Sequence, residues 1–413
     1  MRVLIVGLNY APEPIGIAVY TAGLAEQLAQ SGHEVRVVAG KPYYPQWRVA
    51  EGYRGGWRNT TENAVSVTRC PIYVPADPSG RNRLIHHASF ALSALVPAGV
   101  AAFAFRPDIV LTVAPSLVSA PVAWLAARLG RARSWLHIQD FEVEAAFATG
   151  LIDSTSRIAR IASAFERRVI RLFDRVSSIS PEMCARLETM GVPAANVVEF
   201  RNWAGIIPVA EAGPPSPYRL EWDIRTPHVA LYSGNIANKQ GIEIVLEAAA
   251  LLRTRRDLTF VICGEGPNLA RLRDAATGLP NLQFRPLQPV ERLPELLQLA
   301  TVHLLPQKAD AADLVLPSKL TNMLASGRPV VATAVSGTGL AREIEGCGIA
   351  TTPDDAQAFA AAIERLVDDP ALWAACAEQA SERAQTRWEK TRTIAEVAAA
   401  MARLIRPQGP QAV

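Results

Sequence analysis

The stretch RVLIVGLNYAPEPIGIAVYTAGLAEQLAQSGHEVRVVA, Arg2 to Ala39, contains a complete strand–helix–strand unit. Its first part, RVLIV, is a continuous apolar run, as expected of a parallel strand that is covered on both faces. After a loop that ends at Gly16, apolar residues recur at helical spacing, and the helix is expected to end before Gly32. HEVRVVA predicts the second strand. Units of this kind build parallel sheets.

The same alternation of strands and helices continues along the chain, with no hairpin signal between the strands. A Pro- and Gly-rich stretch at 204–227 interrupts it, and a second series starts at HVALYSG, 228–234. We therefore expect an α/β protein with two Rossmann-like, doubly wound parallel-sheet domains that face a central cleft. The expected domains are 1–205 and 206–387, and a helix in 388–413 is expected to cross back to the first domain.

The composition favours some classes of protein and excludes others. A chain of 413 residues, 49% hydrophobic and 20% charged, fits two globular domains with large cores. A net charge of +3 is too small to indicate a nucleic-acid partner. The five cysteines form no CxxC pair, which predicts reduced thiols, a cytoplasmic location and no structural zinc. The apolar start is too short for a signal peptide.

The run ASFALSALVPAGVAAFAF, 88–105, has no charged residue and lies at the lower limit of length for a membrane-spanning helix. Its alanines and serines weaken the drive to insert, and Pro97 interrupts it. We interpret it as a buried or half-buried helix that leads into the strand PDIVLTVA. The alternative is a segment that docks on a membrane surface.

Ligands of parallel sheets bind at the carboxyl ends of strands, close to helix N-termini. The first strand-to-helix loop ends at Gly16, where a residue without a side chain lets a ligand approach the backbone. The loop YSGNIANKQG, 232–241, offers Gly234, Asn235 and Lys239, and backbone amides with a lysine can hold a diphosphate. Both loops also fit ordinary solvated turns.

Two further loops in the second half carry the same kind of signal. ICGEGPNLARL places Gly264 and Glu265 after a strand, but Leu269 stands where a dinucleotide-binding fold has its third glycine, which counts against NAD. In LPSKLTNMLASG, Ser318 is expected to cap a helix and Lys319 to follow it. A lysine there opposes the helix dipole, so it predicts an anionic ligand.

The stretch LHIQDFE, 136–142, ends a predicted strand and contains one of only six histidines. His137 is either a catalytic group or a histidine packed within the sheet. Because side chains alternate along a strand, His137 and Gln139 share a face. Asp140 lies where the strand ends, and a carboxylate there can orient an acceptor hydroxyl or take its proton. We rank Asp140 before His137.

With these loops in place, the sequence resembles the retaining glycosyltransferases of family 4, which have the two-domain GT-B architecture. Over nearly the whole chain, and in order, LNYAPEPIGI, GKPYYPQWRV, RCPIYVP, LHIQDFEVEAA, AFERRVI, RNWAG, YSGNIANKQG and LPSKLTNMLASG are similar to the fucosyltransferase subgroup of colanic acid and exopolysaccharide biosynthesis. The resemblance implies a GDP- or UDP-sugar donor in the second domain and no metal or other cofactor. It also implies a lipid-linked saccharide acceptor, and a peripheral location at the cytoplasmic face of the membrane.

The resemblance also implies roles for individual residues. The donor is expected to contact the second domain and the first loop of the chain, and the acceptor is expected to contact the first domain. The implied catalytic residues are Asp140, His137 and Lys319. The implied donor-binding residues are Gly16, Gly234, Asn235, Lys239, Gly264, Glu265, Pro317, Ser318, Lys319 and Asn322. The implied acceptor-binding residues are Glu13, Tyr44, Gln139 and Glu142.

The chain also departs from the family pattern. The usual pair of glutamates spaced E-x7-E is replaced by Leu314 and Asn322, and Asn322 can bind a hydroxyl but is not a carboxylate. The alternatives to a transferase are a nucleotide-sugar hydrolase or epimerase, which would turn over donor without acceptor, and a non-catalytic nucleotide-sugar-binding protein. A dehydrogenase would need the dinucleotide fingerprint that is absent.

Overall fold

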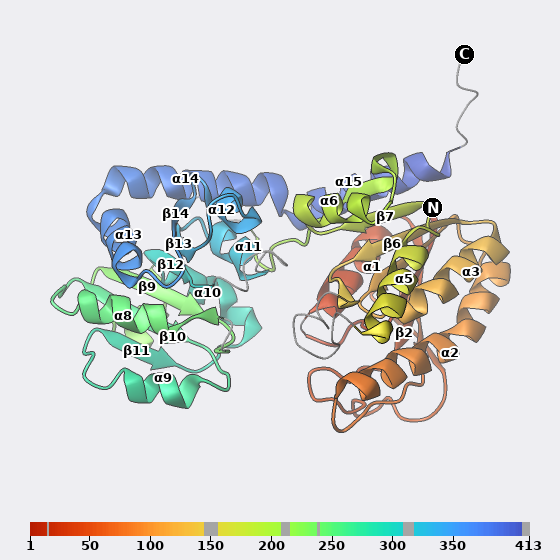
Figure 1. Cartoon of the computed structure of the whole chain (residues 1–413), viewed down its shortest axis with the longest axis horizontal. Coiled ribbons are helices and arrows are strands. Elements are labelled where there is room, and N and C mark those ends of the chain that lie inside the picture. The colour runs from red at the N-terminus through yellow and green to blue at the C-terminus, as the bar shows by residue number, and fades with distance from the viewer. Residues whose placement is uncertain (15, 144–155, 208–214, 238–239, 309–317, 407–413) are drawn as a thin grey trace, which may run out of the picture. The chain divides into compact units, whose positions relative to one another are not determined.

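The structure is a computed structural model that describes residues 1–14, 16–143, 156–207, 215–237, 240–308 and 318–406 (Figure 1). The chain forms two compact units. Unit 1 is Met1–Asn202 with Thr391–Val413, and unit 2 is Trp203–Lys390. The sequence places the two boundaries at 205/206 and 387/388, three residues from each of these. Helix α15, Lys390–Ile405, thus lies almost entirely in unit 1, although the chain enters it from unit 2.

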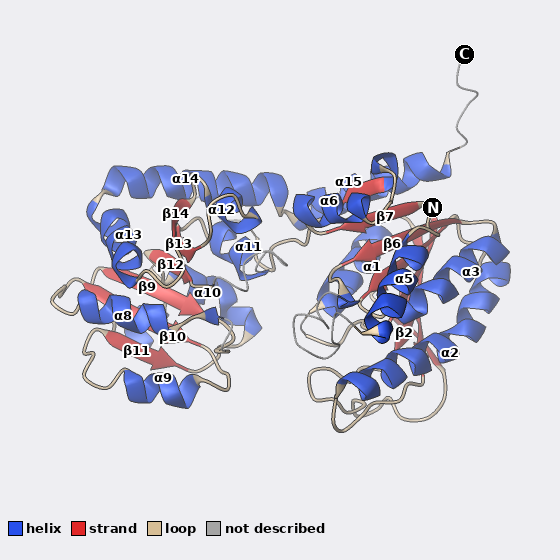
Figure 2. Ribbon diagram, viewed as in Figure 1, coloured by secondary structure: helices blue, strands red, loops and turns tan. Residues whose placement is uncertain are grey.

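Unit 1 is built on an eight-stranded sheet of order β3-β4-β2-β1-β5-β6-β7-β8. Neighbouring strands are parallel except for β3 and β4, and the register of β1 pairs Val3 with Val35 of β2 and with Ile109 of β5. All six residues of β5 are buried, because helices cover both faces of the sheet (Figure 2). The strands are β1 (Arg2–Gly7), β2 (Glu34–Gly40), β3 (Arg58–Glu62), β4 (Val65–Cys70), β5 (Ile109–Ala114), β6 (Arg133–Ile138), β7 (Arg175–Ser178) and β8 (Val197–Glu199).

The helices of unit 1 follow the strands as the sequence predicts. Besides α15 they are α1 (Ile17–Gln30), α2 (Gly80–Ala104), the short η1 (Leu117–Ser119), α3 (Ala120–Gly130), α5 (Arg157–Ile170), α6 (Pro181–Thr189) and η2 (Ala194–Asn196). Helix α2 contains the apolar run of 88–105. Within the described residues it is the one helix long and apolar enough to cross a membrane, and a third of its most apolar window is buried.

Unit 2 contains a six-stranded, fully parallel sheet of order β11-β10-β9-β12-β13-β14. Its strands are β9 (His228–Ser233), β10 (Leu258–Cys263), β11 (Leu282–Arg285), β12 (Val302–Leu305), β13 (Val330–Thr333) and β14 (Gly348–Thr351). Its helices are α7 (Tyr218–Glu221), α8 (Glu243–Leu251), α9 (Leu269–Ala275), η4 (Val290–Arg292), α10 (Leu293–Gln298), α11 (Ser318–Ala325), α12 (Gly339–Ile344), α13 (Ala356–Asp368) and α14 (Pro370–Arg387).

Both sheets are doubly wound, so the α/β fold class expected from the sequence is confirmed. In unit 1 the chain moves outward from β1 through β2 and then returns to the other side at β5. In unit 2 it moves outward from β9 through β10 and returns at β12. In such sheets ligands bind outside the carboxyl ends of the strands, at the point where the strand order reverses. Those points are β1/β5 in unit 1 and β9/β12 in unit 2.

Two local expectations are wrong. The stretch 204–227 is not all linker, because Tyr218, Trp222 and Ile224 belong to a buried hydrophobic cluster of unit 2. The first sheet also contains a hairpin, since β3 runs antiparallel to β4 across a tight turn at Asn63 and Ala64, both with positive φ.

Candidate functional site

At the carboxyl edge of the unit 2 sheet, the loops after β9 and β10 contact each other backbone to backbone. The amide of Ile236 donates to the carbonyl of Glu265 at 2.8 Å. A Cβ atom on Gly264 would overlap the carbonyl of Gly234, so no larger residue fits there. The glycines predicted to bind the donor thus hold two adjacent loops in close contact. Asn235 and Glu265 are exposed beside them.

The structure brings Lys319 onto this edge. Its Nζ donates to the hydroxyl of Tyr232 at 2.8 Å and lies 4.5 Å from the centre of that ring. A Cβ on Gly234 would lie 2.5 Å from Lys319 Cε and 2.8 Å from Nζ, so the glycine leaves space for the lysine. Two residues predicted separately as donor-binding are therefore neighbours, and their contact holds a cation at the switch point of the sheet.

Tyr232 is a residue of this site that the sequence pattern does not single out. It is fully buried, and burial raises the pKa of its phenol. Its hydroxyl donates to the carbonyl of Asn235 at 2.5 Å while accepting from Lys319. Tyr232 is the second-last residue of its strand and precedes a glycine-containing loop. This position could have identified it, because a buried phenol needs a polar partner.

The other residues of unit 2 predicted to bind the donor have less support from the structure than Lys319 and Gly234. The side-chain oxygen of Asn322 accepts a hydrogen bond from the amide of Gly205 at 2.6 Å, which argues against its use for a ligand hydroxyl. Ser318 is exposed and is the first residue of α11, not the residue before it. Lys239 and Pro317 lie outside the described residues.

In unit 1, Gly16 has the position that the sequence predicts. It directly precedes α1 and has φ +67° and ψ −149°, a conformation open to glycine alone. Among the described residues beyond its chain neighbours, none places an atom within 4 Å of where its Cβ would be, and none caps the first amides of α1 with its side chain. The backbone at this helix N-terminus is therefore accessible to an anionic group.

Glu13, predicted to contact the acceptor, is instead buried, and both of its carboxylate oxygens are engaged. One oxygen accepts from the amides of Tyr43 and Tyr44, at 2.9 and 3.0 Å, and the other accepts from Asn9 at 2.9 Å. Burial raises the pKa of this carboxyl. This geometry argues against a direct acceptor contact and makes Glu13 the group that positions Tyr44, whose side chain is exposed.

His137 is a packed histidine. It is 2% exposed and lies against Phe200, with 4.5 Å between ring centres. Its Nδ1 is 2.9 Å from the hydroxyl of Ser177, and its Nε2 is 2.9 Å from the amide nitrogen of Gln139. Burial lowers the pKa of His137 to about 3, so the ring is neutral at physiological pH. These contacts argue against its predicted catalytic role.

Gln139 is buried as well, and its amide pairs reciprocally with the amide of Asn202, with both hydrogen bonds at 2.9 Å. Together with His137, it links the end of β6 to the last residue of the first part of unit 1. A direct acceptor contact by Gln139 is therefore unfavourable, because its polar atoms are already satisfied inside the domain.

Asp140 and Glu142 follow at the carboxyl end of β6. Asp140 is half-buried. Glu142 is 23% exposed; its carboxylate accepts hydrogen bonds from the amides of Ser116 and Leu117, which precede α3, and lies 4.0 Å from Nδ1 of His87. Burial raises the pKa of Glu142 to about 8, helped by the negative charges of Glu166 and Asp140. Burial and the nearby negative charge of Asp140 therefore favour the neutral form of Glu142.

Metal ligands and cysteine chemistry give no further site. Across the residues that the structure describes, no three His, Cys, Asp or Glu side chains are grouped so that they could hold a metal ion. All five cysteines are free and buried.

Solved structures with the same architecture define the class. Sucrose-phosphate synthase from Thermosynechococcus elongatus superposes with a TM-score of 0.70 at 18% identity, covering 98% of this chain and 99% of that one. Anabaena Alr3699/HepE in complex with UDP-glucose superposes with a TM-score of 0.64 at 16% identity, covering 98% of this chain and 100% of that one. At this level of identity the likeness concerns the fold, which is GT-B.

Sequence relatives define the family. A family described as glycosyl transferase 4-like domain matches residues 16–203, and one described as glycosyl transferases group 1 matches residues 227–369. The putative colanic acid biosynthesis glycosyl transferase WcaI of Escherichia coli (strain K12) is 43% identical over 378 residues, which cover 89% of this chain and 92% of that protein. The chain belongs to the family 4 glycosyltransferases.

Proposed function

We propose that this glycosyltransferase moves a sugar, with retention of anomeric configuration, from a nucleotide diphosphate sugar to a lipid-linked saccharide in exopolysaccharide biosynthesis. The observation that carries the proposal is the contact between Lys319, Tyr232 and Gly234 at the switch point of the unit 2 sheet. A fixed ammonium group there matches the negative charge of a diphosphate. The similarity to WcaI supports the polysaccharide product, and a complex of HepE with UDP-glucose supports a nucleotide-sugar donor.

In the proposed reaction the bond between the anomeric carbon and the diphosphate oxygen breaks, and a bond from an acceptor hydroxyl oxygen to that carbon forms on the same face of the sugar, which retains the configuration. Negative charge grows on the leaving diphosphate, and a preorganised cation stabilises that charge. Lys319 supplies this cation without a metal ion. Activity that persists in excess chelator is the expected result; its loss, with recovery on adding Mg²⁺ or Mn²⁺, would contradict this part of the proposal.

Asp140 receives the proton of the acceptor hydroxyl in this proposal, since it is the half-buried carboxylate at the carboxyl end of β6. Glu142 is the neutral carboxyl beside it and accepts the amides that begin the next helical turn. We propose fucose as the transferred sugar because of the subgroup that the sequence resembles, and the cytoplasmic face of the membrane as the place of reaction because the acceptor is lipid-linked.

The donor is tested by thermal unfolding with GDP, UDP, ADP or CDP. A ligand that binds the folded chain at 100 times its dissociation constant adds about 2.7 kcal/mol to the free energy of unfolding. One nucleoside diphosphate is expected to raise the melting temperature. If none does, the nucleotide-sugar proposal is wrong.

The role of Lys319 is tested by Lys319→Ala, with Arg256→Ala as the control that removes an exposed positive charge from the same unit. Loss of one preorganised charge contact is expected to reduce kcat by about 100-fold or more. The control should leave kcat unchanged. Release of free sugar without acceptor at the full rate would identify a hydrolase, and donor binding without turnover would identify a binding protein.

A further inference from the structure

Helix α2 has small side chains on its buried face and large apolar side chains on its exposed face, the reverse of a core helix. Its buried face is made mainly of alanines, among them Ala94 and Ala98, both 0% exposed. Its outward face carries large apolar side chains, with Leu92 at 69%, Val96 at 64% and Phe103 at 63% exposure. A helix that only packs on its own sheet puts large side chains inward and small or polar ones outward. The outward face of α2 therefore has the composition of a contact surface.

Neighbouring elements extend this face. The helix is about 37 Å long at 1.5 Å per residue, and its outward side carries the exposed residues Leu84, Ile85, Leu92, Leu95, Val96, Val100 and Phe103. Helix α3 packs beside α2 and adds exposed Leu125 and Leu129. The exposed indole of Trp57 lies on α2, because its Nε1 donates to the carbonyl of Ser93 at 2.9 Å. We call this set the α2–α3 face.

Arginines flank the α2–α3 face, and acidic residues are absent from it. The segments 78–107 and 116–133 contain six arginines and no Asp or Glu. Arg81 and Arg83 lie in the first turn of α2. Arg106 lies two residues after the end of α2, and Arg131 directly follows the end of α3. Aliphatic side chains together with tryptophan and flanking arginines are typical of proteins that lie at the interface of an anionic bilayer.

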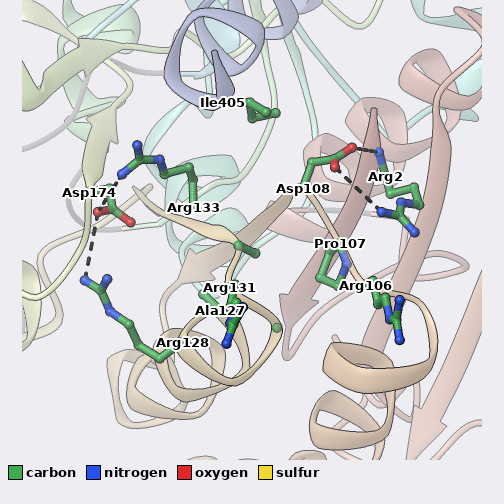
Figure 3. A pocket seen from close by; sticks show the side chains of 12 residues that line it. Arg2, Arg106, Pro107, Asp108, Ala127, Arg128, Arg131, Arg133, Asp174 and Ile405 are labelled. Atoms are coloured by element: carbon green, nitrogen blue, oxygen red, sulfur yellow. Dashed lines mark hydrogen bonds and ion pairs between the residues drawn. The ribbon is translucent and has the colours of Figure 1, made fainter. Parts of the chain in front are cut away.

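One end of the face adjoins a cavity of about 750 Å³ at the amino edge of the unit 1 sheet (Figure 3). Arg2, Arg106, Arg128, Arg131 and Arg133 line it, with Asp108 and Asp174. Both aspartates are engaged, Asp108 by the backbone and side chain of Arg2, and Asp174 by Ser134 and two arginines. Among the described residues, no side-chain partner contacts the guanidinium groups of Arg106 and Arg131, which leaves them available to an anion.

A membrane-spanning helix and a dimer contact both fit the face less well than a lipid surface does. Helix α2 cannot span a membrane while Phe90, Ala94 and Ala98 remain buried against the domain, so it can only lie on a surface. A second copy of the chain, paired about a two-fold axis, would bring this basic face against itself. The like charges of the arginines at both ends would then oppose each other.

We propose that the α2–α3 face docks unit 1 on an anionic lipid bilayer, with α2 in the plane of the surface and the arginine cavity taking phosphate headgroups. The inference rests on the proposed function in one respect, since a lipid-linked acceptor would be presented at that surface. Its physical basis is independent of any donor. Binding to vesicles can be measured without nucleotide or acceptor.

The experiment is co-sedimentation of the full chain with vesicles of phosphatidylcholine alone or mixed with phosphatidylglycerol. The chain is expected to bind the mixed vesicles, and less so as salt is added, because salt screens the arginines. Leu92→Gln with Val96→Gln should weaken binding about tenfold or more, since two aliphatic side chains no longer enter the interface. Arg106→Gln and Arg131→Gln should each cost about fivefold on the anionic vesicles.

The matched control is Leu220→Gln, which replaces a 91% exposed leucine in unit 2 and should leave vesicle binding unchanged. Unchanged melting temperatures show that the variants fold. Absence of binding to the mixed vesicles, or equal binding by Leu92→Gln/Val96→Gln, overturns the proposal. So does a dimer in solution that the same double variant converts to a monomer, because the face then belongs to a second copy. If no nucleoside diphosphate raises the melting temperature while the chain still binds vesicles, the donor proposal alone is refuted.

Discussion

Lys319, Tyr232 and Gly234 depend on one another at the carboxyl edge of unit 2. The phenol of Tyr232 is buried and offers one fixed acceptor to the ammonium group of Lys319, which comes from a helix 87 residues further along the chain. Gly234 is necessary because any side chain there would take the space of the lysine. A long, flexible lysine is thereby held in one position before a ligand arrives, which is what electrostatic stabilisation of a leaving group requires.

Replacement of Gly234 by alanine tests this dependence. The new Cβ would lie 2.5 Å from Lys319 Cε, and the residue has φ +131°, so the lysine must move and the backbone is strained by about 1–3 kcal/mol. The expected result is a loss of kcat approaching that of Lys319→Ala with a moderate loss of stability. Steady-state kinetics and chemical denaturation measure the two effects.

Gly264→Ala is the comparison for that variant. Its Cβ would overlap the backbone carbonyl of Gly234, which cannot move aside as a lysine tip can. This variant should lose more stability than Gly234→Ala. If Gly234→Ala kept full activity, Lys319 would not need its observed position.

The stretch LHIQDFE shows what sequence reasoning can and cannot provide. Alternation along a strand correctly places His137 and Gln139 on one face, and Asp140 at the strand end. It cannot tell whether that face is turned to a ligand or to the domain interior. Ser177, Phe200 and Asn202 make the difference, and they are 40 to 63 residues away in sequence. The position of Lys319 is predictable from its conflict with the helix dipole, but its partner Tyr232 is not.

Asp140→Asn and His137→Ala should therefore have opposite effects. The first removes the proposed proton acceptor at little cost in volume, and transfer should fall by about 10²–10⁴-fold with stability nearly unchanged. The second removes one hydrogen-bond partner from each of Ser177 and Gln139 and creates a cavity, so it should cost about 2–4 kcal/mol of stability. Turnover per folded molecule and urea denaturation distinguish the two. The reverse pattern would make His137 the catalytic residue.

Most helices and strands are predictable because apolar periodicity and Gly or Pro breaks mark them. The hairpin of β3 and β4 is not, because its turn is Asn63–Ala64, while the usual signal for two residues with positive φ is Asn-Gly. Tyr218 and Trp222 resemble linker residues because prolines and glycines surround them, although they pack under the second sheet. In both cases tertiary packing outweighs local residue preference.

Helix α2 is predictable as buried or half-buried, but hydropathy alone does not reveal how large and small side chains are distributed around it. The structure predicts an unusual response to mutation. Ala94→Leu adds volume to a fully buried position and should cost about 1–3 kcal/mol of stability, whereas Leu92→Gln at the exposed face should cost no more than about 0.5 kcal/mol. Thermal or urea unfolding without lipid measures both. A large loss for Leu92→Gln alone would show that the outward face is covered within the chain itself.

Each of the two units buries a histidine of strongly lowered pKa, which couples the stability of the whole molecule to pH. In unit 1 this histidine is His137. In unit 2 it is His303, whose Nε2 lies 2.9 Å from the hydroxyl of Ser326. Burial, together with the positive charge of Arg328, lowers the pKa of His303 to about 3. In unit 1 the raised pKa of Glu142, about 8, acts in the opposite direction, so the clearer measurement is on His303.

The direction of the effect follows from proton binding. Between its unfolded pKa of about 6.5 and its folded pKa of about 3, His303 binds a proton in the unfolded chain but not in the folded one. The free energy of unfolding should therefore fall on acidification below pH 6.5, by at most about 1.4 kcal/mol per pH unit for this group. His303→Gln removes the titration, so the difference between the pH slopes of variant and wild type isolates it.

Glu142→Gln tests a dependence of stability on pH that has the opposite sign. Because the carboxyl of Glu142 stays protonated in the folded chain up to about pH 8, wild-type stability contains a contribution that is lost as pH rises from about 4.5 to 8. The glutamine does not titrate and can still accept the amides of Ser116 and Leu117, so this loss should disappear in the variant. Urea denaturation of wild type and both variants at pH 5, 6, 7 and 8 measures the slopes. Identical slopes for wild type and His303→Gln below pH 6.5 would show that His303 becomes protonated without unfolding. An unaltered slope for Glu142→Gln would show that the carboxylate of Glu142 is already ionised in the folded protein.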